Sequence, residues 1–492
     1  MLFNSFGYFL FLPAVVLIYF LLPLRWRNPF LLIASYYFYM SLKWEFGFLM
    51  LFTGVVNYFA GLKISTAASG RTRQLWLTFA IILSLGVLVY FKYAGFFIRE
   101  ASALLTTLGA NIRESYLKII LPVGISFYTF QALSYTLDVY KEKIKAEKNF
   151  IDLILYVSFF PTLLAGPIER ASNLLVQLKQ EQHFSSDRLL EGAKLILWGL
   201  FKKAVIADRL ATYVDQIYAS PEVYGGSTLF LATLFYTFQL YCDFSGYSDM
   251  AIGSARMLGI KLVQNFTLPY LASSTADFWK RWHMSLTAWF RDYIFLPLSF
   301  SLSAKINRER FLLMRTDMFI YVIAGLVTWL LTGLWHGAGY TFMTWGLLQC
   351  VMLVFYRWQT KPMKRLYKRI GISPKNKIIT LAGTLLTFMA VMVSWVFFRA
   401  EGMNDAGYII ANMFTGWNRI PYLGPSAFDT ILGFGLILLL LFIQALQHRG
   451  ICSIYMSPSG VSRPLRWAGY ALMLVMIAML GVTSDQFIYF QF

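Results

Sequence analysis

Residues 378–398 read IITLAGTLLTFMAVMVSWVFF, and none of them is charged. An α-helix rises about 1.5 Å per residue, so a run of this length crosses the roughly 30 Å hydrocarbon core of a bilayer. Comparable apolar windows recur at 6–24, 75–97, 429–446 and 467–483. Hydrophobic residues make up 58% of the 492-residue chain and charged residues only 14%, a composition foreign to soluble domains. The sequence therefore predicts an all-α, polytopic integral membrane protein.

Basic residues beside the apolar windows predict the orientation of the helices. Lys and Arg number 43 against 24 Asp and Glu, and we assign the resulting net charge of +19 to cytoplasmic loops facing anionic lipid, not to nucleic-acid binding. The segment 357–377 is rich in Lys and Arg and contains no acidic residue, which makes it the strongest cytoplasmic marker. Arg25 and Arg27 follow the first window and no basic residue precedes it, which predicts a retained helix and not a cleaved signal peptide. Both termini are then expected outside the cytoplasm.

Further helices are expected at 28–42, 44–62 and about 119–137, and about eleven or twelve spanning helices in all. The region 150–340 is different, because charged residues interrupt its apolar segments. Irregular backbone is tolerated at membrane depth only where protein or a water-filled cavity covers it. We therefore expect re-entrant or interfacial helices there, and the functional site among them. No linker separates soluble domains, so residues 1–492 are predicted to form one membrane domain.

Several kinds of site are excluded by inspection. The chain contains no GxSxG elbow, no HExxH, no GxxxxGK[ST] loop and no nucleotide-binding GxGxxG. Cys242, Cys350 and Cys452 are too few and too scattered for a disulfide framework or a CxxC metal site. We expect neither a metal nor a permanently bound cofactor. Attention falls on the histidines, of which two, His283 and His336, lie in Trp- and Gly-rich segments of the charged middle region.

The first of these segments is residues 277–293, DFWKRWHMSLTAWFRDY. At helical spacing one face carries Trp279, Trp282, His283, Leu286, Phe290 and Tyr293. The opposite face carries Lys280, Arg281, Arg291 and Asp292. The pattern predicts an amphipathic helix with an aromatic face. That helix could lie along the headgroups with its Trp residues in the interfacial belt, or it could be part of a site.

The second segment is residues 328–339, TWLLTGLWHGAG. Small or polar residues lie about one helical turn apart along this segment and just before it, and together they form a stripe: Gly325, Thr328, Thr332, His336 and Gly339. Such a stripe could be a helix-packing face with a hydrogen-bonded core histidine. An ionisable group inside a membrane is equally a functional hypothesis, because its burial is costly. Histidine titrates near neutral pH, which suits a general base.

These segments, together with others in the same order, are similar to the membrane-bound O-acyltransferase (MBOAT) family, and within it to the branch that acetylates alginate. The stretches that carry the resemblance are 121–131, 159–168, 243–253, 265–266, 269–270, 278–285, 333–337 and 395–399. The resemblance implies acyl transfer from a thioester to a hydroxyl in a tunnel across the bilayer. It also implies a catalytic core at about 119–357, flanked by helices in 1–118 and 358–492.

By this resemblance His336 is the catalytic histidine and His283 is a second important position. The sterol and diglyceride branch has Asn where this chain has His283, which favours a polysaccharide-modifying enzyme. A positioned base that removes the hydroxyl proton typically accelerates such attack about 10²–10⁴-fold, and His336 is our candidate. His283 could polarise the thioester carbonyl, or orient the acceptor or His336, and these alternatives stay open.

Candidate substrate-binding residues follow from the same segments: Trp279, Trp282, Lys280, Arg281, Ser285, Arg291, Asp243, Asp249, Trp335 and Asn265. The implied donor is cytosolic acetyl-CoA, whose phosphates the basic members could attract. Those members could equally reflect the positive-inside rule. Asp243 and Asp249 could line the tunnel or pair with a nearby Lys or Arg, which is the commoner use of a membrane carboxylate.

The expected function is that of an inner-membrane O-acetyltransferase that moves acetyl groups outward to an exopolysaccharide such as alginate. A periplasmic acetyltransferase or acyl-relay protein is the expected partner, beside membrane lipid and the polysaccharide acceptor. D-alanyl transfer to teichoic acid, and acetylation of peptidoglycan or cellulose, use the same chemistry and stay open. A polysaccharide-export transporter is the alternative from another class, since it would also have intramembrane charges and broken helices.

Overall fold

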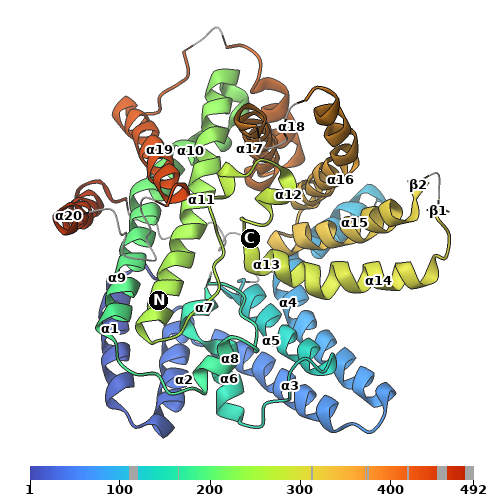
Figure 1. The fold of residues 1–492 in the computed structure, drawn as a ribbon, viewed down its shortest axis with the longest axis vertical. Helices are drawn as coiled ribbons and strands as arrows, with labels where there is room; N and C mark the ends of the chain where they lie inside the picture. The colour runs from blue at the N-terminus through green and yellow to red at the C-terminus, as the bar shows by residue number, and fades with distance from the viewer. Residues whose placement is uncertain are drawn as a thin grey trace. The chain divides into compact units, whose positions relative to one another are not determined.

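The computed structural model describes residues 1–109, 120–164, 166–311, 314–371, 373, 376–417, 420–450 and 462–482 (Figure 1). Within these ranges nearly all regular structure is helical, and the strands are one short antiparallel pair, β1 (Arg310–Phe311) and β2 (Met314–Arg315). The prediction of an all-α polytopic protein is confirmed. Cys452, Lys375, and the expected helix ends at 119 and 483 lie outside the described residues.

The chain divides into two compact units, each discontinuous in sequence. Unit 1 comprises Met1–Gly199 and Tyr247–Val263, and unit 2 comprises Leu200–Gly246 and Gln264–Phe492. The long helix α11 (Gly226–Met257) contributes to both units. The expected catalytic core at 119–357 is a functional division and stays a prediction.

Unit 1 contains the five helices expected near the amino terminus and several shorter ones. They are α1 (Phe6–Leu21), α2 (Leu24–Met40), α3 (Phe46–Thr66), α4 (Gly70–Thr107), α5 (Ile125–Tyr140), α6 (Phe150–Ser158), α7 (Phe160–Leu163), α8 (Leu174–Leu178) and α9 (Ser186–Leu200), whose last residue belongs to unit 2. Side-chain caps begin several of them. Ser5 accepts from Tyr8 N at the start of α1, Ser69 accepts from Thr72 N at the start of α4, and Asn149 accepts from Ile151 N at the start of α6. The helix expected at 75–97 is present as α4, which runs for 38 residues and therefore extends beyond the apolar window at both ends.

Small and polar residues let α3 pack closely inside unit 1. A Cβ on Gly54 would lie 2.7 Å from Ile154 Cδ1, so only glycine fits without movement. The buried Asn57 amide donates to Ser84 Oγ at 2.9 Å and accepts from Thr136 Oγ1 at 2.6 Å. Close backbone approach and paired polar groups are the usual means by which helices associate without a hydrophobic driving force.

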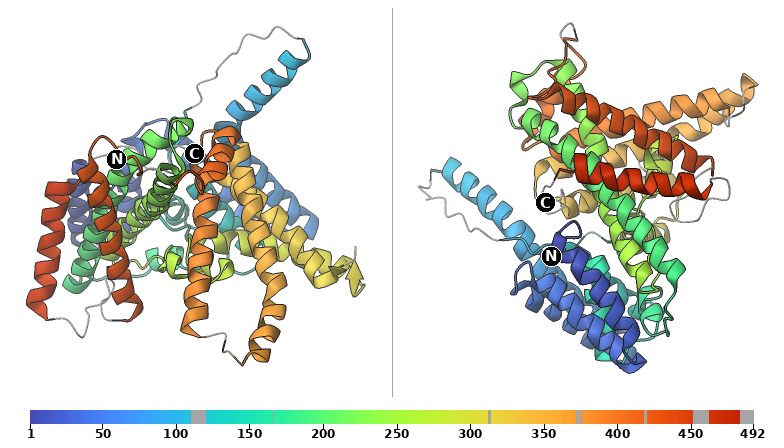
Figure 2. Two further views of the ribbon diagram at one scale, coloured as in Figure 1. Left: turned by 90° about the horizontal axis from the view of Figure 1, so that it is seen from above. Right: turned by 90° about the vertical axis from the view of Figure 1, so that its left-hand side faces the viewer.

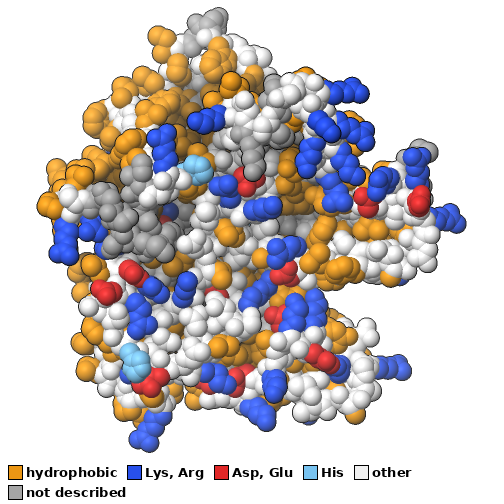
Figure 3. Space-filling view, viewed as in Figure 1, with side chains coloured by type: hydrophobic (Ala, Val, Ile, Leu, Met, Phe, Trp, Pro, Cys, Tyr) orange, Lys and Arg blue, Asp and Glu red, His pale blue; other side chains and the backbone are white. Residues whose placement is uncertain are grey.

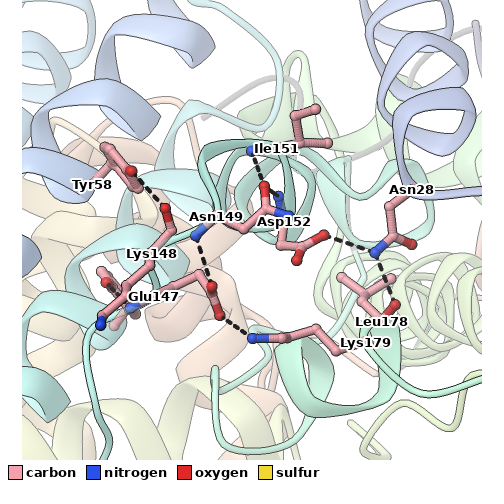
Figure 4. A network of polar contacts seen from close by, with 10 residues as sticks. Asn28, Tyr58, Glu147, Lys148, Asn149, Ile151, Asp152, Leu178 and Lys179 are labelled. Atoms are coloured by element: carbon pink, nitrogen blue, oxygen red, sulfur yellow. Dashed lines mark hydrogen bonds and ion pairs between the residues drawn. The ribbon is translucent and has the colours of Figure 1, made fainter. Parts of the chain in front are cut away.

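One end of unit 1 is held by a polar network around the loop before α6 (Figure 4). Lys179 Nζ lies 2.7 Å from Glu147 Oε2, and Asn149 N donates to Glu147 Oε1 at 2.9 Å. Asn28 Nδ2 donates to Asp152 Oδ1 at 2.8 Å. Burial raises the pKa of Glu147, but the hydrogen bonds from Lys179 and Asn149 outweigh it, so this pKa lies below its ordinary value.

Unit 2 holds the remaining elements in chain order. They are η1 (Phe201–Ala207), α10 (Asp208–Tyr218), η2 (Pro221–Val223), η3 (Pro269–Leu271), α12 (Thr275–Phe278), α13 (Met284–Phe290), η4 (Arg291–Phe295), α14 (Leu296–Lys305), α15 (Thr316–His336), α16 (Tyr340–Arg369), α17 (Lys377–Arg399), α18 (Met403–Asn412), α19 (Ala427–His448) and α20 (Arg463–Leu480). The helices expected at 378–398, 429–446 and 467–483 are present as α17, α19 and α20. Helices α16 and α17 lie side by side (Figure 2).

Six helices in the described ranges are long and apolar enough to cross a membrane, namely α3, α4, α15, α17, α19 and α20. Helix α1 is apolar but shorter. Helix α20 has no buried residue, and Leu472 and Val475 are more than half exposed, as expected of side chains in contact with lipid. The chain is thus a multi-pass membrane protein, and the total of eleven or twelve spans stays a prediction. Lys and Arg far outnumber Asp and Glu on the face shown in Figure 3.

Candidate active site

The single amphipathic helix predicted over 277–293 is wrong. Helix α12 ends at Phe278 and α13 begins at Met284. Between them His283 has φ 41° and ψ 53°, a left-handed conformation that interrupts the helical hydrogen-bond ladder. All six side chains assigned to the aromatic face are buried, but they pack inside unit 2 and do not form an interfacial belt. Lys280 and Arg291 are exposed, as the pattern predicts.

Asn265 explains why the chain turns at His283. Its carbonyl accepts from Met284 N at 3.0 Å, and its Oδ1 accepts from Ser285 N at 3.2 Å and from Ser285 Oγ at 2.6 Å. The first N–H groups of a helix have no partner within the helix, so Asn265 acts as a cap supplied from another segment. Asn265 and Ser285, predicted to touch substrate, here hold the backbone that carries His283.

His336 is the last residue of α15 and is 3% exposed. Its Nδ1 lies 2.7 Å from the backbone carbonyl oxygen of Thr332. A carbonyl oxygen can only accept, so Nδ1 carries the hydrogen, and in the neutral ring Nε2 keeps a lone pair. Helix geometry thereby selects the tautomer in which His336 can accept a proton at Nε2.

The end of α15 requires glycine at two positions beside His336. A Cβ on Gly333 would lie 2.3 Å from the carbonyl oxygen of Phe342, and one on Gly337 would lie 2.2 Å from the Phe342 ring. These two glycines beside His336 let α15 pack closely against α16, whereas Thr328 and Thr332 of the predicted stripe line a cavity. Gly339 departs from the prediction, because it lies beyond the end of α15 and precedes α16.

Two histidines far apart in sequence meet in this site. The ring centroids of His283 and His336 are 6.5 Å apart, and His283 is only 1% exposed. Trp335 lies beside both rings, at 6.0 Å from His283 and 4.9 Å from His336. Phe244 of α11 packs edge-on against His283 at 4.6 Å. Buried aromatic side chains thus surround both histidines and exclude bulk water from their rings.

An aromatic cluster continues from His336 into α16 and α17. Trp345 lies 4.9 Å from His336 and stacks on Trp395 at 5.7 Å with planes 17° apart. Trp279 Nε1 donates to Gln349 Oε1 at 3.2 Å, and Gln349 Nε2 donates to Ser394 Oγ at 3.0 Å. Trp345 and Gln349 were not among the site residues predicted from the sequence. Their spacing of four residues on α16 was the available signal, but apolar spans share it widely.

A cavity of about 170 Å³ opens beside this cluster within unit 2. Its lining is mostly aromatic and aliphatic, with threonine hydroxyls and one basic group: Trp279, Leu286, Thr287, Phe290, Arg291, Phe295, Tyr321, Thr328, Trp329 and Thr332. Thr332 both lines the cavity and supplies the carbonyl that binds His336. The cavity therefore reaches the helical turn that carries this histidine. In the described ranges no cluster of three or more His, Cys, Asp or Glu side chains is arranged to hold a metal ion.

Comparison with known proteins shows to which enzyme family this chain belongs. Residues 66–399 match MBOAT, the membrane-bound O-acyltransferase family. The chain belongs to this family. It is accordingly an O-acyltransferase, and the resemblance found in the sequence is confirmed.

Relatives of this MBOAT chain include enzymes that modify bacterial glycans. The probable alginate O-acetylase AlgI of Azotobacter vinelandii is 40% identical over 411 residues, covering 83% of this chain and 76% of the relative. AlgI of Pseudomonas syringae pv. tomato is 39% identical, covering 83% and 74%. The peptidoglycan O-acetyltransferase of Helicobacter pylori is 33% identical, covering 82% and 78%.

The other predicted site residues of the MBOAT chain have different surroundings. Arg281 pairs with Asp277 at 3.0 Å, and Arg291 pairs with Asp292 at 2.8 Å while also lining the cavity. Trp282 lies 5.1 Å from Trp395 in the aromatic cluster. Asp249 belongs to unit 1, whereas every other candidate belongs to unit 2.

Asp243 belongs to a buried ion cluster, so the predicted alternative of pairing is confirmed for it. Lys203 Nζ lies 2.6 Å from Asp243 Oδ1 and 2.8 Å from Asp208 Oδ1, and all three side chains are at most 4% exposed. The neighbouring Lys202 donates to Ser245 Oγ at 2.8 Å. Both lysines lie on η1, a π-helix, and π-helical turns often occur at functional sites. Lys203 thus binds α11 at Asp243 and Lys202 binds it at Ser245. Phe244, the residue that contacts His283, lies between these two positions.

Proposed function

We propose that this MBOAT chain is an inner-membrane O-acetyltransferase that takes acetyl groups from cytosolic acetyl-CoA for the O-acetylation of an exopolysaccharide such as alginate. The observation that carries the proposal is the contact between His336 Nδ1 and the Thr332 carbonyl, which leaves Nε2 as a base inside a water-excluded aromatic site. The glycan-modifying relatives support the choice of acceptor class.

In the proposed reaction the acceptor hydroxyl attacks the thioester carbonyl carbon. His336 Nε2 takes the hydroxyl proton as the new C–O bond forms, and negative charge builds on the carbonyl oxygen. The C–S bond then breaks, and the departing thiolate takes the proton back from His336. An alcohol is a poor nucleophile near neutral pH, so this proton transfer is where the base lowers the barrier, by about 10²–10⁴-fold in typical cases.

His283 lies close enough to assist His336, with ring centroids 6.5 Å apart. It acts either on the thioester carbonyl or by orienting the acceptor or His336. The small cavity beside Thr332 suits a slender apolar group such as the acyl end of the donor. We further propose that a periplasmic acetyltransferase or acyl-relay protein receives the acetyl group, and that both chain termini lie in the periplasm.

The test is acetyl-CoA turnover by the purified protein in nanodiscs, with thermal melting as the folding control. His336→Ala is expected to abolish turnover at an unchanged melting temperature. His183→Ala is the matched control, since that side chain is 80% exposed and its removal should leave activity intact. A folded His336→Ala variant that turns over acetyl-CoA like the wild type would contradict the proposal.

The donor and acceptor are tested by the same assay with other substrates. Turnover of a carrier-bound D-alanyl group in place of acetyl-CoA would redirect the proposal to teichoic acid modification. Transfer to peptidoglycan or cellulose fragments, but not to alginate, would change the acceptor and leave the chemistry intact. Glycan transport by reconstituted vesicles without any acyl turnover would favour the transporter alternative.

A further inference from the structure

Trp345 is a fully buried residue whose polar atom has no evident use in the fold. Its side chain is 0% exposed on α16. Throughout the part of the chain that the structure describes, the indole Nε1 finds no hydrogen-bond acceptor. An unsatisfied buried N–H destabilises a fold, so its presence requires an explanation.

The same cluster shows that an indole N–H can be satisfied here. Trp279 Nε1 donates to Gln349, which lies one helical turn beyond Trp345 on α16. Trp345 Nε1 has no such acceptor, and among the described residues Trp395 Nε1 beside it has none either. A ligand atom that entered beside His336 would supply the acceptor that Trp345 Nε1 lacks.

The position of Trp345 is rigid and borders the proposed base. One ring face stacks on Trp395 at 5.7 Å, and Phe398 packs edge-on at 5.3 Å. The centroid of the ring lies 4.9 Å from that of His336. Donors that stabilise developing charge are most effective when they are held in place in a dry site, because no reorganisation is then needed.

The chemistry at His336 creates a need for such a donor. Attack on a thioester carbonyl places negative charge on the carbonyl oxygen. His336 cannot neutralise that charge, because its Nδ1–H is committed to Thr332 and its Nε2 takes the acceptor proton. A separate N–H close to His336 is required.

We propose that the indole Nε1–H of Trp345 donates a hydrogen bond to the carbonyl oxygen of the transferred acyl group as negative charge develops on it. This assignment rests on the proposed O-acetyltransferase function and makes Trp345 a catalytic residue. Its ligand class is a thioester carbonyl, and the interaction is strongest in the tetrahedral state. His283 is then left to orient the acceptor hydroxyl or His336.

The decisive variant is Trp345→Phe, which keeps an aromatic ring on Trp395 and removes the N–H. We expect kcat with acetyl-CoA to fall roughly 10²-fold, as for the loss of one oxyanion donor, while KM changes little. The melting temperature should stay close to the wild-type value, because removing an unsatisfied buried donor offsets the packing lost with the smaller ring. Trp358→Phe is the matched control on the same helix, since Trp358 is 64% exposed, and it should leave kcat unchanged.

Three outcomes would overturn the assignment. If Trp345→Phe retains kcat within a few-fold of wild type while His336→Ala is inactive, the O-acetyltransferase proposal stands and Trp345 serves packing alone. If Trp345→Phe loses kcat and its melting temperature also falls, Trp345 has a packing role. Its N–H would then contact the face of a neighbouring aromatic ring. Absence of acetyl-CoA turnover in wild type and variants alike contradicts the proposed reaction, and this assignment with it.

Discussion

His336 Nδ1 donates to the carbonyl oxygen of Thr332 across 2.7 Å, one turn back along the same helix. The acceptor belongs to the helix backbone, so no side-chain substitution on α15 removes it. A histidine that ends a helix in this way has its tautomer chosen by the helix itself. The proton-accepting nitrogen is Nε2, which is the atom that general-base catalysis needs.

The rate of acetyl-CoA turnover should depend on pH in the way expected of a histidine base. A base must be deprotonated to accept a proton, so kcat should be constant at higher pH and fall in acid as the imidazole becomes protonated. The measurement is acetyl-CoA turnover between pH 5 and about 8.5 in nanodiscs, with melting temperature followed in parallel. A rate that rises toward acid pH would speak against His336 as the base.

Asn265 should affect both stability and activity, because it caps α13 from outside that helix. Asn265→Ala removes the acceptor for Ser285 N and Oγ and is expected to cost about 0.5–2 kcal/mol of stability. It should also lower kcat, since the left-handed turn at His283 loses its support. Asn149→Ala is the control, because Asn149 caps α6 in unit 1. Equal losses of activity in both variants would show that Asn265 has no special link to His283.

Lys203 should be essential for the stability of unit 2. Lys203→Met leaves the buried carboxyl groups of Asp208 and Asp243 without this counter-ion. Breaking a buried ion pair by removing one partner typically costs about 3–5 kcal/mol. Thermal melting in detergent should show a large decrease, whereas Lys280→Met, at an exposed position, should show almost none. Similar melting of the two variants would contradict a structural role for the cluster.

Gly333 should tolerate no side chain. A Cβ at this position would lie 2.3 Å from a backbone oxygen of α16, so Gly333→Ala must push α15 and α16 apart and displace His336. We expect a lower melting temperature and loss of turnover. Gly435→Ala on α19 is the control, because a Cβ at that position would meet no atom within 4 Å and alanine favours a helix by about 1 kcal/mol. A neutral Gly333→Ala would show that the helix crossing is loose.

Glu147 should make stability depend on pH in the acid range. Its pKa in the folded protein is lower than the ordinary 4.5, so folding favours the charged form. The stabilisation is complete above pH 4.5 and disappears as the pH falls through the lower folded-state pKa. Glu147→Gln should therefore melt below the wild type at neutral pH and match it in strong acid. A difference that is independent of pH would indicate that Lys179 contributes by packing only.

Much of the fold could be predicted because each signal is local. Windows such as 378–398 and 429–446 became α17 and α19, since in a bilayer the backbone must satisfy its own hydrogen bonds and an apolar run of that length forms a helix. The burial of the aromatic side chains around Trp282 was also predicted correctly, although Trp279, Trp282 and His283 lie in the turn between α12 and α13. His283 and His336 were selected from residue type and family resemblance, and their catalytic roles stay predictions.

Hydrophobic runs and ordered motifs were enough to predict that this protein is helical, spans the membrane several times and belongs to the O-acyltransferases. The turn at His283 is visible only in the folded chain, because its cap comes from Asn265, 20 residues before its partner Ser285. The folded chain also shows that the two histidines meet and that Trp345 borders His336. Contacts between distant segments arise from how helices pack, and no local pattern records which side chains that packing brings together.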